Sequence, residues 1–298
     1  MCGIVGLRLK NASLEPSLGR MVEPMLDVLS SRGPDSTGVA VYARDEPDGV
    51  VKYSLCAPGE AFDWERLAAE LAEQLGEPVL IRRRSRDATA ISKVPSQVFL
   101  EVLHRVDPGV KVFGHGVAIE VLKDVGPALE VCERYGVSGM TGYQAIGHTR
   151  MATESAVTIE HSHPFAPAAD LALVHNGSFS NYASVRRGLL DQGARFDTDN
   201  DSEVAARFIA SRLADGDDLA EALRRVLKVF DGFFTLLVST KDEIAVVRDS
   251  FACKPMVIAD TEDYVAMASE YIALANLPDV EKARVFEPMP EEIHSWGR

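Results

Sequence analysis

The residue of greatest chemical interest is the cysteine at position 2, within the N-terminal sequence MCGIVG of residues 1–6. Removal of Met1 would leave a thiol and a free α-amine on Cys2. Their ordinary pKa values, about 8.5 and about 7.7–8.0, give each group a reactive fraction near neutral pH. A terminal amine can activate the nucleophile of its own residue. The alternative is a small apolar residue at the start of a buried strand, and residues 1–6 alone do not separate the two.

An asparagine and a glycine could stabilise the negative charge that develops on an amide oxygen during hydrolysis. His175, Asn176 and Gly177 directly follow an expected strand at 171–174. At a strand end, the Asn176 amide and the Gly177 N–H can point at one oxygen. Asn-Gly is also an ordinary turn sequence. The pair is therefore a candidate oxyanion hole or a simple turn.

Charged residues of both signs could hold the two ends of an amino-acid substrate. Arg150, in the sequence GHTRMAT, offers a planar fork for a carboxylate, and Thr153 adds a hydroxyl three residues later. Residues 199–203 (DNDSE) offer carboxylates for an ammonium group, or simply cap a helix. Arg32 opens the sequence RGPDSTG and places a guanidinium beside a tight turn. Arg150 also has a plainer interpretation, as a surface charge.

Composition excludes several classes of partner. The chain has 298 residues and a formal net charge of −14, which opposes binding to nucleic acids or anionic membranes. Residues 82–86 (RRRSR) form a basic cluster, which we interpret as a solvated loop or a contact with an acidic partner. No stretch predicts a membrane helix or a secretory signal. We expect a soluble protein of the reducing cytoplasm, because no Cys-x-x-Cys spacing links the four cysteines, Cys2, Cys56, Cys132 and Cys253.

Helical and strand patterns succeed one another in a way that predicts an α+β layered fold. At 15–29 apolar residues recur at three- and four-residue spacing, and a Gly-Pro turn follows. Short connections between the later strands favour antiparallel pairing. The stretch from about 54 to 140 predicts an inserted βα subdomain. The expected helices are 15–29, 63–75, 96–106, 127–135, 202–213 and 219–230, and the expected strands are 38–42, 79–81, 171–174, 233–239, 243–248, 255–258 and 264–268.

Six sequence motifs occur in one order along the chain, and together they resemble those of the class II glutamine amidotransferases. They are MCGIVG, RGPDSTG, GHTRMAT, the His-Pro pair at 163–164, HNG and TDNDSE. That family has the N-terminal-nucleophile (Ntn) hydrolase fold, in which two antiparallel sheets lie between helical layers. The resemblance implies a four-layer αββα sandwich, a glutamine amidotransferase type 2 domain over residues 2–298 with an insertion at about 54–140.

By the resemblance, Cys2 is the nucleophile that attacks the side-chain amide of L-glutamine, and its own α-amine is the base. Asn176 and Gly177 match the oxyanion hole. The remaining matches are Arg150 and Thr153 for the α-carboxylate, Asp201 and the Gly177 carbonyl for the α-ammonium, His163 as a supporting residue near the pocket, and Arg32 as the arginine that steadies the N-terminal strand.

One departure from the family motif concerns Glu154, because many members have histidine at the matching position. A carboxylate there would repel the substrate carboxylate. Synthesising relatives join this domain to a synthase domain, and the chain looks most like the stand-alone subunits related to glutamate synthase, including the small subunit of N-methylglutamate synthase. We therefore expect a hetero-oligomer in which ammonia passes to a separate, flavin-containing synthase subunit. No cofactor is expected in this chain.

Two other functions stay open from the residues themselves. One is a glutamine-binding or scaffolding subunit of the same complex, in which Glu154 prevents turnover. The other is a metal hydrolase, because histidines and carboxylates of zinc-binding type lie close in sequence. Its candidate ligands are His148, His161, His163, His175 and either Asp199 or Asp201.

Overall fold

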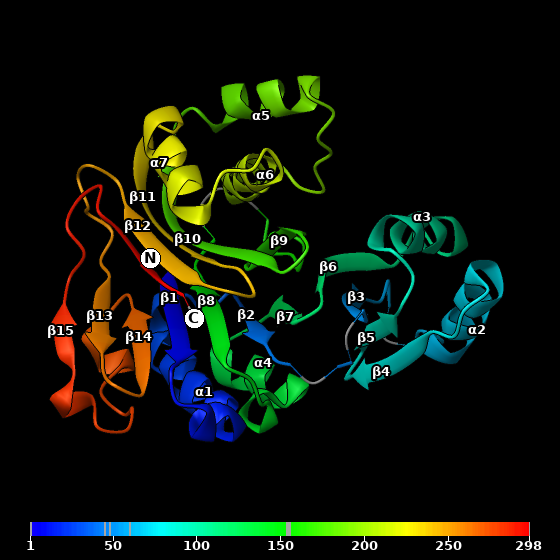
Figure 1. The fold of residues 1–298 in the computed structure, drawn as a ribbon, viewed down its shortest axis with the longest axis horizontal. Helices are drawn as coiled ribbons and strands as arrows, with labels where there is room; N and C mark the ends of the chain where they lie inside the picture. The colour runs from blue at the N-terminus through cyan, green and yellow to red at the C-terminus, as the bar shows by residue number, and fades with distance from the viewer. Residues whose placement is uncertain (1, 45, 48, 60, 153–155, 298) are drawn as a thin grey trace.

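A computed structural model describes residues 2–297 except 45, 48, 60 and 153–155. In the described chain, two antiparallel sheets lie face to face between helices, and a smaller third sheet lies beside them (Figure 1). The seven-stranded sheet runs β15 (Arg284–Phe286), β13 (Val257–Asp260), β14 (Tyr264–Ala268), β1 (Gly3–Leu9), β8 (Gln144–Arg150), β2 (Ser36–Tyr42) and β7 (Ile119–Val125). The five-stranded sheet runs β16 (Ile293–Trp296), β12 (Ile244–Arg248), β11 (Gly232–Ser239), β10 (Leu171–Phe179) and β9 (Phe165–Ala168).

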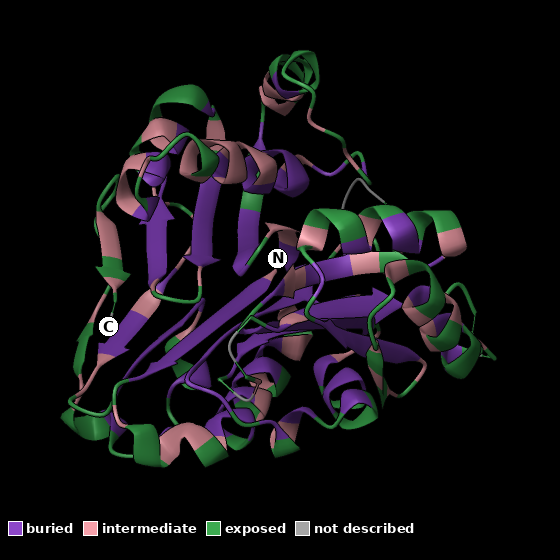
Figure 2. Cartoon of the chain, turned by 45° about the vertical axis from the view of Figure 1, so that its right-hand side comes forward, coloured by how far each residue is buried: buried purple, intermediate pink, exposed green. Residues whose placement is uncertain are grey.

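Alternation along the strands creates three apolar layers, because successive side chains of a strand point to opposite faces. In β1, Ile4 packs between the two sheets, whereas Val5 and Leu7 pack under the outer helices. Both faces of the central strands are therefore buried, as Figure 2 shows. Each fully buried aliphatic side chain contributes about 1.5–3 kcal/mol of transfer free energy.

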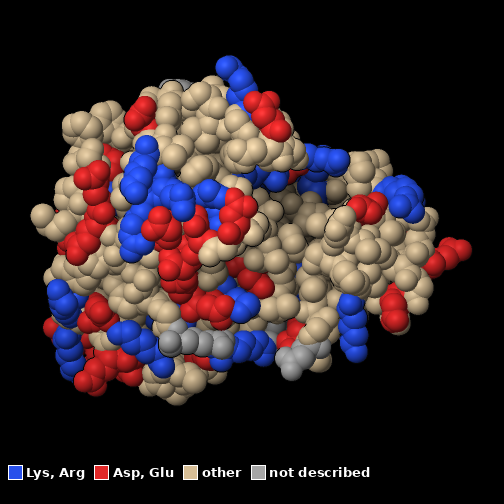
Figure 3. Space-filling model, turned by 45° about the horizontal axis from the view of Figure 1, so that its top comes forward, with Lys and Arg blue, Asp and Glu red and all other residues tan. Residues whose placement is uncertain are grey.

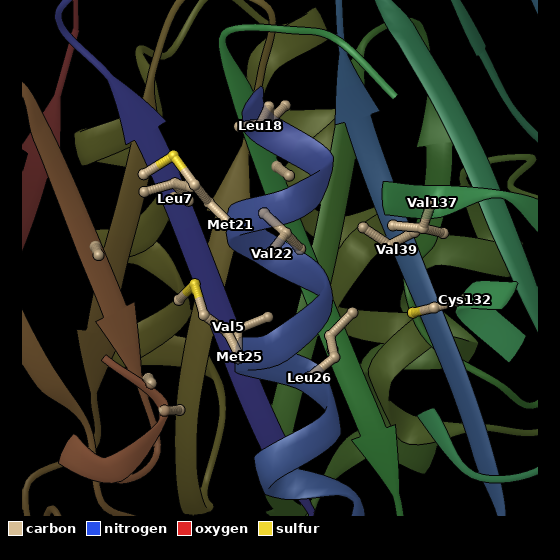
Figure 4. Packing of buried hydrophobic residues seen from close by; sticks show 14 of the residues in the cluster. Val5, Leu7, Leu18, Met21, Val22, Met25, Leu26, Val39, Cys132 and Val137 are labelled. Carbon is tan, nitrogen blue, oxygen red and sulfur yellow. The ribbon is translucent and has the colours of Figure 1, made fainter. Parts of the chain in front are cut away.

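Amphipathic helices cover the two outer faces. Helix α1 (Leu18–Leu29) places Leu18, Met21, Val22, Met25 and Leu26 against the seven-stranded sheet (Figure 4), together with α4 (Ala128–Tyr135). The other sheet is covered by α6 (Asp201–Ala214) and α7 (Leu219–Val229), and α5 (Tyr182–Asp191) packs on α6. This order of layers confirms the expected αββα sandwich. The helix expected from residue 15 begins at Leu18, because a 3-10 turn, Ala12–Ser17, containing Pro16 precedes it.

A separate small unit, built from residues 51–116, forms where the sequence predicts an insertion. It is a four-stranded sheet in the order β4-β5-β3-β6, covered by two helices. The chain then returns to the main body, because β7 pairs with β2 and α4 packs on α1. Within the stretch 54–140, β7 and α4 are therefore part of the main body, and the limits of an insertion relative to the family stay a prediction. The elements of the small unit are β3 (Val51–Cys56), α2 (Trp64–Leu75), β4 (Leu80–Arg84), β5 (Asp87–Ser92), α3 (Ser96–Val106) and β6 (Lys111–Gly116).

The basic cluster at 82–86 is not a solvated loop. Most of it lies in β4, and Arg84 Nε lies 2.8 Å from Glu120 Oε1. Arg86 Nη2 lies 2.7 Å from Oδ1 of the buried Asp124. Both carboxylates belong to β7, so the cluster ties the insertion to the main sheet. In the described part of the chain, no helix is long and apolar enough to cross a bilayer.

Candidate active site

The stacking of the two sheets brings Cys2 and Asn176 together, although they are 174 positions apart. Cys2 directly precedes β1 of one sheet, and Asn176 lies in β10 of the other. The carbonyl oxygen of Cys2 accepts hydrogen bonds from Asn176 Nδ2 at 3.3 Å and from Arg32 Nε at 3.1 Å. Arg32 also forms an ion pair with Glu270. Two side chains from different elements thus fix the residue that carries the thiol.

Gly177 lies inside strand β10, not at its end. The strand continues to Phe179, and Gly177 pairs with Phe234 of β11. Its φ is +149°, and a Cβ atom there would lie 1.9 Å from the carbonyl oxygen of Phe233. Only glycine fits this close approach without a backbone shift. The turn interpretation of Asn-Gly is therefore wrong.

A cavity of about 490 Å³ opens beside these residues. Its lining includes Cys2, Arg150, Asn176, Gly177 and Asp201. With His163, which also belongs to the lining, the structure therefore brings together six of the predicted site residues. Thr153 and Glu154, for which the sequence predicts opposite effects on a bound carboxylate, lie outside the described residues.

Opposite charges line this cavity at Arg150 and Asp201. Arg150, the last residue of β8, is buried and donates to the carbonyl oxygen of Ala156 at 3.2 Å. Burial lowers the pKa of its guanidinium, while Cys2, Asp35 and Asp201 act in the opposite direction. Asp201 begins α6; its Oδ2 accepts from the Phe179 N–H at 2.9 Å and its Oδ1 from Ser202 Oγ at 3.1 Å. Both charged groups are held in place by neighbouring atoms.

A stack of neutral histidines lies behind the cavity. The His163 ring, which reaches the lining, stacks on His148 with centroids 4.1 Å apart. Burial lowers the pKa of His163 well below its ordinary value, and that of His148 to about 3. Both ring nitrogens of His163 lack a hydrogen-bond partner among the described residues. His148 Nε2 lies 2.9 Å from the carbonyl oxygen of His175. Because both imidazoles are neutral near pH 7, this face of the cavity is uncharged.

The histidines do not form a metal centre in the described residues, where no group of three or more His, Cys, Asp or Glu side chains could hold an ion. His161, a candidate ligand, instead lies with Nε2 2.7 Å from Asp199 Oδ1 and Nδ1 2.8 Å from Thr158 Oγ1. His175 Nδ1 lies 2.8 Å from Ser202 Oγ. The geometry thus favours positioning roles over metal ligation.

Four further lining residues lie outside the six motifs and were not predicted from the sequence: Ser178, Tyr182, Phe233 and Lys254. Phe233 enters the lining because β11 pairs beside Gly177 and Ser178. That register depends on how two strands meet, and no local motif encodes it. Tyr182 and Lys254 lie in segments that carry none of the six motifs.

Comparisons with known proteins find similarity to glutamine amidotransferases. A family model described as a glutamine amidotransferase domain matches residues 148–276. The chain is 45% identical over 297 residues to the glutamine amidotransferase-like protein GlxB of Rhizobium meliloti, covering 99% of this chain and 98% of that protein. It is 32% identical over 299 residues to a putative glutamine amidotransferase of Methanothermobacter thermautotrophicus, covering 97% of each.

Among solved structures, the chain is similar to glutamine phosphoribosylpyrophosphate amidotransferase from B. subtilis, with a TM-score of 0.64 and 20% identity over 99% of this chain. A second structure, described as the allosteric regulatory enzyme of purine biosynthesis, gives a TM-score of 0.65, also at 20% identity and 99% coverage. This chain spans 47% of each of those chains. The likeness concerns the fold, two stacked antiparallel sheets between helices.

Proposed function

The chain belongs to the class II glutamine amidotransferases, and on this premise we propose that it hydrolyses L-glutamine at Cys2 and supplies the ammonia to a separate synthase subunit. The observation that carries the proposal is the contact of the Asn176 amide with Cys2, at a cavity that also holds Arg150 and Asp201. These residues supply an amide donor, a cation and an anion beside one thiol.

Glutamine would be held by its two charged ends. The Arg150 guanidinium would pair with the α-carboxylate, and the Asp201 carboxylate, with the Gly177 carbonyl, would receive the α-ammonium. The cavity volume of about 490 Å³ is ample for a five-carbon amino acid. Binding at both ends would present the side-chain amide to Cys2 in a fixed orientation, which lowers the entropic part of the barrier.

The proposed reaction has two steps. In the first, Cys2 Sγ bonds to the amide carbon while its proton passes to the α-amine of Cys2, and the amide oxygen becomes an oxyanion that accepts from Asn176 Nδ2 and the Gly177 N–H. The C–N bond then breaks, and the nitrogen leaves as ammonia with the proton from the α-ammonium. In the second step, water attacks the thioester carbon, which releases glutamate and restores the thiol.

We propose that the ammonia is used by a separate, flavin-containing synthase subunit of a glutamate-synthase-like or N-methylglutamate-synthase-like complex. The match with GlxB covers 98% of that relative, which leaves no room in it for a fused synthase domain. A chain tagged at its C-terminus should retain a partner that shows flavin absorbance. Recovery of the chain alone, from cells in which the complex is made, would remove this part of the proposal.

The hydrolysis itself is tested with two cysteine variants of the complex. Cys2→Ala should abolish release of glutamate and ammonia from glutamine. Cys253→Ala, which removes an exposed thiol that is not part of the cavity lining, should retain it. Glutamine binding without turnover in the unmodified chain would favour the glutamine-binding subunit instead. Turnover that survives in Cys2→Ala would contradict the mechanism.

A further inference from the structure

A second cavity, of about 310 Å³, lies at the seam between the insertion and the main body. Helix α3 and strand β6 form one wall, and β9 with the segment that leads into α6 forms the other (Figure 1). The surface is hollowed at this seam (Figure 3). Its lining shares no residue with that of the Cys2 cavity. It is therefore a separate site.

The most unusual lining residue is Lys123 of β7, which is 4% exposed. Its Nζ donates to the carbonyl oxygens of Ser162 at 2.8 Å and Pro164 at 3.4 Å. The Nζ also lies 4.6 Å from the ring centroid of Phe113 and 5.1 Å from that of Phe165. No described carboxylate lies within 4.0 Å of it. A buried ammonium without a counter-ion is costly, and two carbonyls and two aromatic faces compensate only part of that cost.

The other buried charges at the seam are already paired. Glu203 accepts from the Asp197 and Thr198 N–H groups and from Arg207 Nε, at 2.7–2.9 Å. Arg207 Nη2 also lies 2.8 Å from Asp197 Oδ2. These groups satisfy one another. Lys123 is therefore the buried charge at the seam for which a ligand can supply the counter-ion.

Apolar side chains form much of the remaining wall near Lys123. Leu100, Leu103, Val110 and Val112 come from the insertion, opposite Phe165. A cavity of this size accepts a molecule of about ten heavy atoms. We propose that the seam binds a small carboxylic acid with an apolar body, whose carboxylate pairs with Lys123 and whose body packs on the aromatic and aliphatic wall. A neutral or cationic analogue would leave the ammonium without its counter-ion.

A ligand bound at the seam can affect the Cys2 cavity through a short stretch of backbone. The carbonyls that Lys123 holds belong to the two neighbours of His163, whose ring lines that cavity. A carboxylate that draws Nζ away would loosen both neighbours and change the affinity for glutamine. This second step rests on the proposed function, whereas the binding step does not.

Calorimetric titration of the full chain with benzoate, with benzyl alcohol as neutral isostere, tests the binding step. At pH 7 benzoate should bind at one site per chain, and the alcohol about tenfold or more weaker. Lys123→Met should lose about tenfold or more in benzoate affinity. Lys111→Met, which removes an exposed charge at the rim of the same cavity, should not. Arg150→Met, which alters only the other cavity, should also bind as the unmodified chain does.

Benzoate titrations at a series of pH values need no variant. They test the site even if Lys123→Met fails to fold. Burial lowers the pKa of Lys123 to about 8, and the titratable groups around it are Glu203, Cys56, Glu160, Asp197 and His163. Hydrogen bonds lower the pKa values of Glu203 and Glu160, burial lowers the pKa of His163, and burial raises the pKa of Cys56 to about 12. Benzoate affinity should therefore fall about tenfold or more between pH 7.5 and about 9.5.

Three results would overturn the site: no saturable heat with benzoate up to about 20 mM, equal binding of benzyl alcohol, or undiminished binding by a folded Lys123→Met. Loss of benzoate binding in Arg150→Met would place the ligand in the Cys2 cavity and also overturn it. If benzoate binds at the seam but leaves the KM for glutamine unchanged, only the coupling step fails. Failure of glutamine hydrolysis itself would leave the benzoate result intact.

Discussion

Replacement of Asn176 by alanine separates two roles that one side chain can play. Asn176 Nδ2 donates to the Cys2 carbonyl at 3.3 Å, and one of its two hydrogens remains available for a developing oxyanion. If it serves the oxyanion, the loss of one donor should lower kcat by about 10²–10³, or about 3–4 kcal/mol. If Asn176 only positions Cys2, the fall in kcat should equal the fall caused by removing another hydrogen bond to the Cys2 carbonyl.

Arg32→Met is the matched control, because Arg32 Nε donates to the same carbonyl oxygen at 3.1 Å. Each variant removes one bond to that oxygen: the neutral bond from Asn176 contributes a net of about 1 kcal/mol to stability, and the bond from the charged Arg32 about 1.5–3 kcal/mol. Arg32→Met also removes the ion pair with Glu270. Each folded variant should therefore keep most of its stability in urea unfolding. Steady-state release of glutamate then compares their kcat values in the same complex.

The oxyanion assignment predicts a selective fall in kcat for Asn176→Ala, well beyond that of Arg32→Met, with little change in KM. A fall of less than about tenfold would leave the Gly177 N–H as the main donor. Equal falls in both variants would mean that Asn176 acts only by holding Cys2.

Three further outcomes follow from the geometry. Asp201→Asn should raise the KM for glutamine more than it lowers kcat, and unchanged glutamine binding by calorimetry would remove the ammonium assignment. Gly177→Ala should unfold or inactivate the chain, because its Cβ would lie 1.9 Å from a carbonyl oxygen, whereas Gly139→Ala, with no atom within 4 Å, should retain stability and turnover. Because burial lowers the pKa of His148 from 6.5 to about 3, the folded state excludes a proton that the unfolded chain binds. This contribution to the free energy of unfolding is complete above pH 6.5 and declines as pH falls toward 3, by about 2 kcal/mol at pH 5. His148→Gln, which keeps a donor, should reduce the fall in urea stability between pH 7 and pH 5 by about that amount, and the buried His163 and His175 should account for a further part of the fall.

Local periodicity predicted the helices that carry a strong apolar stripe in their own sequence, whereas α5, in which only Leu189 is buried, was not predicted. The expected helices at 202–213 and 219–230 appear as α6 and α7 within one residue at each end. Helix α6 begins after Asn200, whose side chain accepts from the Ser202 N–H at 2.8 Å. A cap is a local feature, so sequence alone can place it.

Strand limits depend on partners, and there the sequence was less informative. The predicted strand at 171–174 stops before Asn-Gly, because that pair is typical of turns. In the fold, β11 pairs with β10 through Phe179, and the positive φ of Gly177 permits the close approach of Phe233. The place of β7 in the main sheet could not be predicted for the same reason. The pairing of β7 with β2 joins residues about eighty positions apart, and no local pattern records it.

The two cavities also differ in how far local sequence could predict them. Most residues of the Cys2 cavity, Cys2, Arg150, Asn176 and Asp201 among them, fall in short motifs whose order resembles that of a known family, so they could be identified before any distance was known. Lys123 lies in no motif and in none of the helices or strands that the sequence predicted. It becomes chemically unusual only when β6 and β9 meet over it and bury its ammonium between Phe113 and Phe165. A site of this kind forms where the small unit packs on the main body. It has to be sought in the structure, because its residues come from elements that share no motif.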